Sequence, residues 1–299
     1  MPTIDSSPTA SGIGNVGIVG LGLLGGAIAA RLVERGFSVV GYDANESRRD
    51  VALNDGVVVV NSAAEVAAKC ELVLLSLPTG DISALVVREL APQLHRGQII
   101  VDTTTAAAEQ MIALAGLLTP LGVAFVEAEV AGSSVQVRRG EVLVFVSGDD
   151  AVVAKCRPVL EAFAVAVHHA GNTGDAARWK LVHNLLLGLH RAVLAEGLVL
   201  AEALGLDASR ILEVLKQSPA ASAVMTTKGA KMLARDFTPQ ATVRQHLKDV
   251  RLILAAAAAC GAETPLSQLH ASLLERASEL GYAEADNSAI MAAFSRKSS

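Results

Sequence analysis

Two polar residues, Lys180 and Asn184, stand four positions apart in a stretch whose pattern predicts a long helix. Residues at i and i+4 lie on one face of a helix, about 6 Å apart along its axis. An amine and a carboxamide placed in this way can address the same alcohol or carbonyl oxygen. Such pairs are usually only surface residues. This pair gains weight from the GNTG turn at 171–174, which places the helix start at a domain junction, where clefts form.

A glycine-rich turn near the N-terminus has the spacing of a phosphate-binding loop. Gly20, Gly22 and Gly25 form a G-x-G-x-x-G pattern, with Leu23 and Leu24 between the last two glycines. The pattern follows a predicted strand and opens a predicted helix, and this context gives it meaning. The turn lets backbone approach a pyrophosphate, and the helix N-terminus offers it free N–H groups and partial positive charge. The sequence therefore predicts a dinucleotide cofactor.

Asp43 is the residue predicted to choose between the two nicotinamide dinucleotides. It ends the second predicted strand, at about the distance beyond the glycines that the fold requires. A carboxylate there accepts hydrogen bonds from both ribose hydroxyls and repels a 2′-phosphate, so NAD is favoured. Arg48 and Arg49 leave NADP as an alternative cofactor, because a nearby guanidinium can hold a 2′-phosphate. A solvated helix face is the commoner explanation of such a pair.

These residues need elements that hold them, and the first half of the chain predicts a parallel sheet. Short apolar runs alternate there with helical patterns, which is typical of strands covered on both faces. The predicted strands are 15–20, 37–42, 57–60, 72–77, 98–102, 123–126, 141–147 and 164–168. The predicted helices between them are 23–35, 45–54, 62–69, 81–94 and 106–119.

The second part of the chain is predicted to be helical throughout. The long helix at 175–204 is apolar on most sides, which indicates burial in a core or a subunit contact. The helices predicted after it are 207–217, 222–234, 240–260, 264–280 and 286–296. The fold class is α/β, with an N-terminal Rossmann domain and an all-α domain. The Rossmann domain is a doubly wound, mostly parallel sheet at 13–173, after a flexible tail at 1–12. The all-α substrate and oligomerisation domain follows at 174–299.

The composition argues against several classes of protein. Of the 299 residues, 52% are hydrophobic and 18% are charged, so a large buried core is possible. The formal net charge of −5 and the lack of a basic run argue against a nucleic-acid partner. The uncharged stretch at 6–30 is interrupted by many glycines, which argues against a membrane partner. Three widely spaced cysteines fit a reducing, cytoplasmic location and predict neither a disulfide framework nor a metal site.

Four motifs occur in order along the chain: GLGLLGGAIAARL at 20–32, DTTT at 102–105, GNTGDAARWKLVHN at 171–184, and Lys248-Asp249. Their order and spacing resemble the β-hydroxyacid dehydrogenase family, which includes 3-hydroxyisobutyrate dehydrogenase and tartronate semialdehyde reductase. The resemblance covers nearly everything from Asn15 to about Phe294.

The resemblance implies a role for each motif. Lys180 would be the general acid/base at the hydroxyl or carbonyl oxygen, and Asn184 would orient the substrate. Lys248 would close over cofactor and substrate from the helical domain. The residues implied to contact the cofactor beyond the glycine turn and Asp43 are Leu77, Pro78, Thr105 and Lys248. The implied reaction moves a hydride between NAD or NADP and a small β-hydroxy acid or its semialdehyde, in a homodimer or homotetramer.

The segment at 127–133 departs from the family pattern. The family usually has D-A-P-V-S-G-G there, whereas this chain has EAEVAGS. In the family this loop holds the substrate carboxylate, so the implied substrate-binding residues are Ala131, Gly132 and Ser133. Ala131 removes one hydroxyl donor, worth about 0.5–1.5 kcal/mol, and Ser133 either returns a hydroxyl or crowds the pocket. Glu129 replaces the proline and is expected to point to solvent. These changes affect the expected substrate more than the reaction type.

Two other functions are left open by the sequence. An imine reductase-like NADPH enzyme has this architecture but normally lacks a lysine at the catalytic position, so Lys180 argues against it. A non-catalytic dinucleotide-binding interaction module is suggested by the altered 127–133 segment. Such a module would bind cofactor without turning over any acid.

Overall fold

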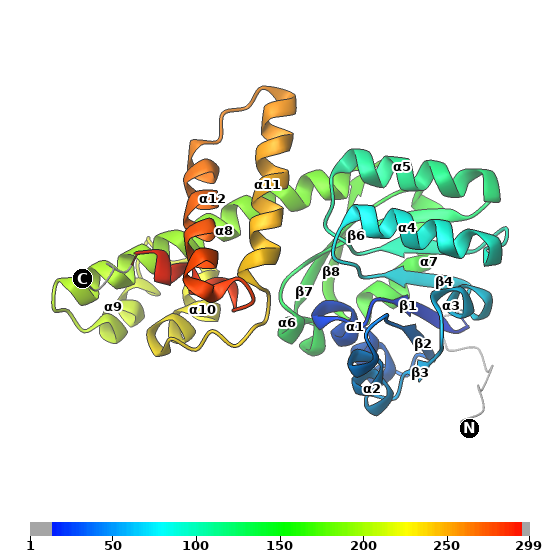
Figure 1. Ribbon diagram of the computed structural model, residues 1–299, viewed down its shortest axis with the longest axis horizontal. Coiled ribbons are helices and arrows are strands. Elements are labelled where there is room, and N and C mark those ends of the chain that lie inside the picture. Colours follow the sequence, from blue (N-terminus) through cyan, green and yellow to red (C-terminus); the bar gives the residue numbers. More distant parts are fainter. Residues whose placement is uncertain (1–13, 295–299) are drawn as a thin grey trace. The chain divides into compact units, whose positions relative to one another are not determined.

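Eight strands form one sheet in the first of two compact units into which the chain divides, Met1–Lys180 and Leu181–Ser299 (Figure 1). The computed structural model describes residues 14–294, so the predicted tail at 1–12 lies outside the described residues. The strands are β1 (Val16–Val19), β2 (Val39–Tyr42), β3 (Val58–Val59), β4 (Leu72–Leu75), β5 (Ile99–Asp102), β6 (Ala124–Ala131), β7 (Val142–Ser147) and β8 (Ala164–Gly171).

The strand order is β3-β2-β1-β4-β5-β6-β7-β8. All neighbouring strands are parallel except β6 and β7, which are antiparallel. The predicted doubly wound, mostly parallel sheet is therefore confirmed. The chain leaves β1 toward β2 on one side and returns to β4 on the other. This is a topological switch point, and ligands of such sheets bind beyond the carboxyl ends of the strands there.

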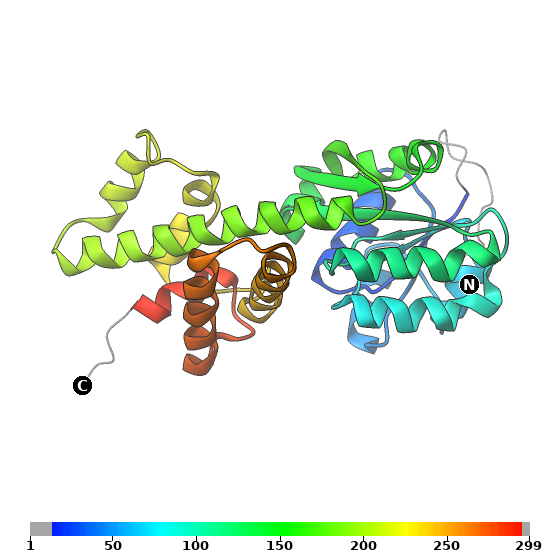
Figure 2. The ribbon, with the colours of Figure 1, turned by 90° about the horizontal axis from the view of Figure 1, so that it is seen from above.

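Helices cover both faces of the sheet, as Figure 1 and Figure 2 show. The helices of this unit are α1 (Leu23–Glu34), α2 (Glu46–Asn54), α3 (Ala63–Lys69), α4 (Gly80–Leu90), α5 (Ala108–Leu118), α6 (Ser134–Arg139) and α7 (Asp150–Glu161). Neighbouring residues of β1 point to opposite faces, so Ile18 joins one hydrophobic core with Leu32 of α1. Val19 joins the second core with Met111 of α5.

Several elements differ from the prediction. Helices α6 and α7 were not predicted, although each begins at a capping residue, Ser133 and Asp149, whose side chain accepts a backbone N–H. Strand β6 was predicted to end at residue 126 but continues to Ala131. The segment expected to be a substrate loop is therefore largely strand, because it pairs with β7 beyond the end of β5.

The second unit is built from helices. They are the later part of α8 (Asp175–Ala203), then α9 (Ala208–Leu215), α10 (Ala223–Ala234), α11 (Val243–Cys260) and α12 (Pro265–Ala277). The predicted helix at 286–296 is a 3₁₀ helix, Asn287–Phe294. The hydrophobic core includes Leu198 of α8, Met232 of α10 and Val250 of α11.

Helix α8 crosses the boundary between the two units. The domain boundary was predicted at residue 173, before this helix, whereas the first compact unit extends to Lys180. The first turns of α8 belong to that unit because Ala176 and Ala177 pack into its hydrophobic clusters. By length and hydropathy α8 could span a membrane, but buried residues such as Leu198 place it in a protein core.

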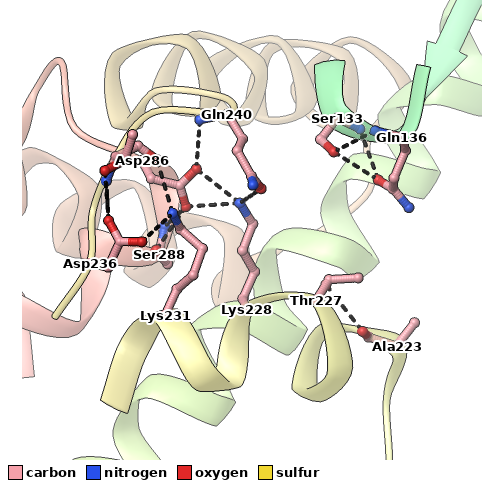
Figure 3. Close-up of polar contacts among 11 residues, drawn as sticks. Ser133, Gln136, Ala223, Thr227, Lys228, Lys231, Asp236, Gln240, Asp286 and Ser288 are labelled. Atoms are coloured by element: carbon pink, nitrogen blue, oxygen red, sulfur yellow. Dashed lines mark hydrogen bonds and ion pairs between the residues drawn. The ribbon is translucent and has the colours of Figure 1, made fainter. Parts of the chain in front are cut away.

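A buried ion pair links the elements of the second unit (Figure 3). The ammonium of Lys228 on α10 lies 2.9 Å from both carboxylate oxygens of Asp286 and 3.1 Å from the side-chain oxygen of Gln240. Asp286 also accepts the backbone N–H of Gln240 and the N–H and hydroxyl of Ser288. One carboxylate thus joins three segments that are far apart in the sequence.

The three cysteines are all free thiols and differ in their surroundings. Cys70 and Cys156 are buried, and burial raises the pKa of each thiol to about 12. Cys260, the last residue of α11, is exposed.

Candidate functional site

The glycine turn is shaped by close backbone approaches at the end of β1. Gly20 has φ +96°, and a Cβ atom there would lie 2.2 Å from the carbonyl oxygen of Ser76. A Cβ atom on Gly25 would lie 1.9 Å from the carbonyl oxygen of Gly20. Side chains at these positions cannot be accommodated, so the turn and α1 are packed directly against the strand ends.

The N-terminus of α1 suits an anionic ligand. Gly22 is its N-cap and offers no side-chain cap, and the first turn, which contains Leu23 and Leu24, has no acidic residue. The N–H groups and the positive end of the helix dipole are therefore available to a phosphate. These features fit a dinucleotide pyrophosphate, which these residues would hold through their backbone.

Asp43 is buried directly beyond β2 and is fixed by backbone groups. One carboxylate oxygen accepts the N–H of Leu21 at 2.7 Å, and the other accepts the N–H of Asn45 at 2.8 Å. The carboxylate is thus tied to the glycine turn itself. Arg48 lies 3.7 Å from the carboxylate, and Arg49 donates at 2.7 Å to the carbonyl oxygen of Asp43. Both arginines therefore contact the residue predicted to select the cofactor.

The ends of β4 and β5 are joined by a hydrogen-bonded hydroxyl. Thr104 Oγ1 accepts the N–H of Leu77 at 3.0 Å and the hydroxyl of Ser83 at 3.1 Å. The N–H of Thr104 donates to Asp102 Oδ1 at 2.8 Å, and burial raises the pKa of Asp102 to about 6 despite these hydrogen bonds. The network fixes the backbone that leads to Pro78 on one side and toward Thr105 on the other.

Strand β6 projects beyond its neighbour β5 and provides the contacts of the predicted catalytic lysine. Pairing with β5 ends at Glu127, so the following residues pair only with β7. On this projection the Lys180 ammonium donates to the carbonyl oxygen of Val130. The Thr105 hydroxyl donates to Glu129 Oε2 at 2.9 Å.

The expectation that Glu129 points to solvent is wrong. Its side chain has no solvent exposure. Alternate residues of a strand share a face, so Glu129 lies on the same face of β6 as Glu127 and Ala131, which is covered by the start of α8. Its direction could not be predicted from the sequence, because it follows from the extension of β6 past residue 126.

Glu127 determines where α8 begins. Its two carboxylate oxygens accept the N–H groups of Gly174 and Ala177, each at 2.8 Å, and the hydroxyl of Ser147. Burial raises the pKa of Glu127, and these donors oppose the shift. The carboxylate satisfies N–H groups that a helix start leaves unpaired. Lys180 follows one turn later and is itself only 7% exposed.

The remaining residues of the predicted substrate loop are Ala131, Gly132 and Ser133. The structure gives the Ser133 side chain a local role at the start of α6. The Ser133 hydroxyl belongs to a capping box with Gln136 at the start of α6. It therefore does not replace the hydroxyl that Ala131 lacks. Ala131 is buried at the end of β6, and Gly132 follows it.

In the second unit, Asn184 and the Lys248-Asp249 pair come together. Asn184 Nδ2 donates to Asp249 Oδ2 at 3.1 Å, and the Lys248 ammonium lies 3.3 Å from Asp249 Oδ1. Sequence reasoning missed Arg191, which is two turns after Asn184 on α8 and is buried. Burial lowers the pKa of Arg191 to about 10, while Asp286 and Asp249 oppose the change.

Within residues 14–294, no group of three or more His, Cys, Asp and Glu side chains could hold a metal ion.

Comparison with known proteins agrees with this geometry. Residues 15–171 match the family model described as the NAD binding domain of 6-phosphogluconate dehydrogenase. Residues 174–294 match the model described as the NAD-binding domain of NADP-dependent 3-hydroxyisobutyrate dehydrogenase.

Similar proteins cover almost the whole chain. Glyoxylate/succinic semialdehyde reductase 1 of Arabidopsis thaliana is 29% identical over 94% of this chain and 99% of its own. 2-(Hydroxymethyl)glutarate dehydrogenase of Eubacterium barkeri is 28% identical over 92% of this chain and 93% of its own. The crystal structure of a 3-hydroxyisobutyrate dehydrogenase from Salmonella typhimurium has a TM-score of 0.86 and 28% identity, covering 93% of this chain and 99% of that one.

Proposed function

The chain belongs to the β-hydroxyacid dehydrogenase family and is an NAD(P)-dependent oxidoreductase. From this premise we propose that it transfers a hydride between NAD and a small β-hydroxy acid or the matching semialdehyde. Lys180 acts as the general acid/base. The observation that carries the proposal is the buried Lys180 ammonium at Val130, on the strand that projects from the carboxyl edge of the sheet.

The reaction requires one proton transfer by a side chain of the protein. When bound, the nicotinamide supplies or accepts the hydride. In the reducing direction, Lys180 donates a proton to the developing alkoxide, and in the oxidising direction it accepts the hydroxyl proton. In the second unit, Asn184 and Lys248 both contact Asp249, and we propose substrate-binding roles for these two side chains.

NAD is the proposed cofactor because Asp43 places a fixed carboxylate at the end of β2. Its two backbone hydrogen bonds hold the side chain, so its charge stays at the position where a 2′-phosphate would have to bind. Arg48 and Arg49 contact Asp43 and supply the positive charge through which NADP would compete.

The proposed substrate is a small carboxylic acid. The similar proteins are named for reactions on glyoxylate, succinic semialdehyde, 2-(hydroxymethyl)glutarate and 3-hydroxyisobutyrate, which are all small acids. The backbone at Ala131, Gly132 and Ser133 would receive the carboxylate. The cytoplasm is the proposed location, since all three cysteines are free thiols.

The test is NAD⁺ or NADP⁺ reduction at alkaline pH, followed at the nicotinamide absorbance. The substrates are 3-hydroxyisobutyrate, glycerate, threonate, 3-hydroxypropionate and 4-hydroxybutyrate. Lys180→Ala should lower kcat by at least about 100-fold, the typical contribution of a general acid/base, and should leave cofactor binding unchanged. Lys155→Ala, an exposed lysine on α7, is the control and should keep full activity.

Turnover by Lys180→Ala equal to that of the wild type would refute the assigned role. Cofactor binding without turnover of any acid would instead favour the non-catalytic interaction module. Turnover of cyclic imines with NADPH would favour the imine reductase-like alternative.

A further inference from the structure

One face of α8 carries Asn184, Gly188 and Arg191, and α11 and α12 pack against it. The three residues stand at i, i+4 and i+7, so they share one side of the helix. A Cβ atom on Gly188 would lie 2.4 Å from His246 Nε2 on α11 and 2.5 Å from His270 Cε1 on α12. Side chains of both helices therefore pack directly on α8 between Asn184 and Arg191.

Arg191 is a buried cation on this face. It is only 4% exposed, and among the described residues its Nη1 atom is buried without a hydrogen-bond partner. A buried charge is costly unless it is compensated. Burial lowers the pKa of Arg191 to about 10, and the charges of Asp286 and Asp249 oppose this shift. Arg191 thus stays cationic near neutral pH, and carboxylates compensate its charge.

The buried charges of the second unit balance in pairs. Among residues 181–294, the buried side chains of Lys, Arg, Asp and Glu are Arg191, Lys228, Asp249 and Asp286. Lys228 pairs with Asp286 at 2.9 Å, so Arg191 is the buried cation that remains to balance Asp249. Lys248 also lies 3.3 Å from Asp249, but its side chain is 24% exposed and is proposed to bind the substrate. Asp249 therefore needs a second cation when Lys248 binds the substrate.

We propose that Arg191 is a positioning residue that keeps Asp249 ionised, so that Asp249 holds Asn184 in one orientation while Lys248 binds the substrate. This inference rests on the proposed function, which gives Asn184 and Lys248 their roles. An ionised carboxylate only accepts hydrogen bonds, whereas a protonated one also donates. Ionised Asp249 accepts Asn184 Nδ2 at 3.1 Å and so fixes which way round the carboxamide lies. A protonated Asp249 would also satisfy the reversed carboxamide.

The test has to separate Asp249 from the other titratable groups nearby. The charged and titratable groups around Arg191 and Asp249 are Lys228, His246, Lys248, His270 and Asp286. Burial and, to a smaller extent, Arg191 lower the pKa of His270 to about 4, so a variant of Arg191 affects this histidine as well. The readout must therefore come from a group that contacts Asp249 itself.

The side-chain amide of Asn184 is that readout, because it donates to Asp249. Its signal is followed by heteronuclear NMR of the full-length protein during a pH titration, without cofactor or substrate. The signal is assigned by its loss in Asn184→Ala. The transition that belongs to Asp249 is identified by its loss in Asp249→Asn.

Arg191→Met keeps a long side chain and removes the charge, so the midpoint of this transition should rise by about one pH unit or more. Arg191→Lys keeps a cation and should restore most of the wild-type midpoint. Arg251→Met is the matched control. It removes an exposed cation of α11 that pairs with Glu275 at 2.9 Å, and it should leave the midpoint unchanged.

Turnover gives a second readout. With an acid that the wild type oxidises, the acid limb of kcat/KM against pH should move upward in Arg191→Met by the same interval as the midpoint. At a fixed pH on that limb, one pH unit corresponds to a loss of about 10-fold. At alkaline pH, where Asp249 is ionised in both proteins, kcat/KM should be nearly equal.

A midpoint that does not move in Arg191→Met, or that moves equally in Arg251→Met, overturns the inference. So does a shifted midpoint with an unchanged pH profile of turnover. If no acid is turned over, the proposed function fails for these substrates, and the titration decides the inference alone because it needs no turnover. If Arg191→Met does not fold, the double variant with Asp249→Asn removes both charges and should fold. A double variant that also fails to fold would show that Arg191 compensates another group, and it overturns the inference.

Discussion

At the scale of single residues, the first unit is notable for three carboxylates without solvent exposure, Asp102, Glu127 and Glu129. A buried charge is costly unless hydrogen bonds or opposite charges compensate it. Asp102 accepts a backbone N–H, Glu127 accepts two N–H groups at the start of α8, and Glu129 accepts a hydroxyl. Each carboxylate thus fixes a different segment around the carboxyl ends of β5 and β6.

Asp102 should make the first unit less stable as the pH rises. Burial raises its folded-state pKa to about 6, above the unfolded value of about 3.9. The folded state therefore binds the Asp102 proton more tightly than the unfolded state does. The stability gained from this proton is complete below pH ~4 and is lost as the pH rises from ~4 to ~6. Asp102→Asn keeps an acceptor for the Thr104 N–H and does not titrate. Relative to the wild type, its unfolding free energy should rise by about 2 kcal/mol from pH 4 to 7.

Denaturant unfolding of both proteins across this pH range gives the difference directly. Parallel curves for the two proteins would show that Asp102 does not titrate in this window.

At the scale of elements, the second unit depends on one carboxylate that joins α10, the segment before α11 and the C-terminal 3₁₀ helix. Asp286 receives the Lys228 ammonium, the Gln240 N–H and two groups of Ser288. Burial alone would raise the pKa of Asp286, but Lys228 and Ser288 outweigh it and hold the pKa below its usual range. The stability that Asp286 contributes is therefore present at neutral pH and is lost as the pH falls through its folded-state pKa.

Removing one member of the Lys228–Asp286 ion pair should lower the free energy of unfolding by more than the intact pair contributes to it. Asp286→Asn leaves the Lys228 ammonium buried without its counter-charge, and the unfolding free energy should fall by about 3–5 kcal/mol. Lys228→Met removes the other charge. In a double-mutant cycle, the double variant should lose clearly less than the sum of the two single losses. Additive losses in chemical denaturation would contradict the coupling.

At the scale of the whole molecule, α8 has an outer face that is unusually apolar. Its exposed apolar side chains recur at helical spacing and include Val182, Leu186, Val193 and Leu200. An apolar stripe of this kind, interrupted here at the exposed Glu196 and Gly197, is typical of a protein–protein contact. We therefore expect a homodimer or homotetramer in which this stripe of α8, the outer stripe, is covered by a second copy of the chain.

A charge in the outer stripe should weaken this assembly. Val193→Glu and Leu200→Glu place a carboxylate where it would be desolvated in the contact. Analytical ultracentrifugation at micromolar concentration should show a shift toward monomer, with unchanged helical circular dichroism. Val214→Glu alters an exposed apolar residue of α9 outside the stripe and should sediment like the wild type. A wild-type monomer would refute the expectation.

Most of the fold could be predicted because its signals are local. Valine-rich runs such as Val16–Val19 are buried on both faces and alternate with helices, which is the pattern of a parallel sheet. The antiparallel β7 and the extension of β6 could not be predicted. They depend on pairing between distant segments, such as Glu127 with Ser147, rather than on local composition.

The candidate site shows the same division. The glycine turn, Asp43 and Lys180 follow motifs with fixed spacing, and the structure places them beyond the carboxyl ends of the strands or on the helix that follows. Glu129 and Arg191 could not be assigned in this way. Their burial depends on which segment covers them, and one sequence contains no signal for that.

The contrast among the thiols makes the natural sequence suitable for site-specific spectroscopy. Thiolate is the reactive form, and burial with a pKa of about 12 keeps Cys70 and Cys156 protonated and shielded near neutral pH. Of the three, Cys260 alone is an exposed residue, at the end of α11. A maleimide dye therefore attaches once per chain without any engineered cysteine. The fluorescence of this dye can then report ligand binding at α11, the helix that carries Lys248.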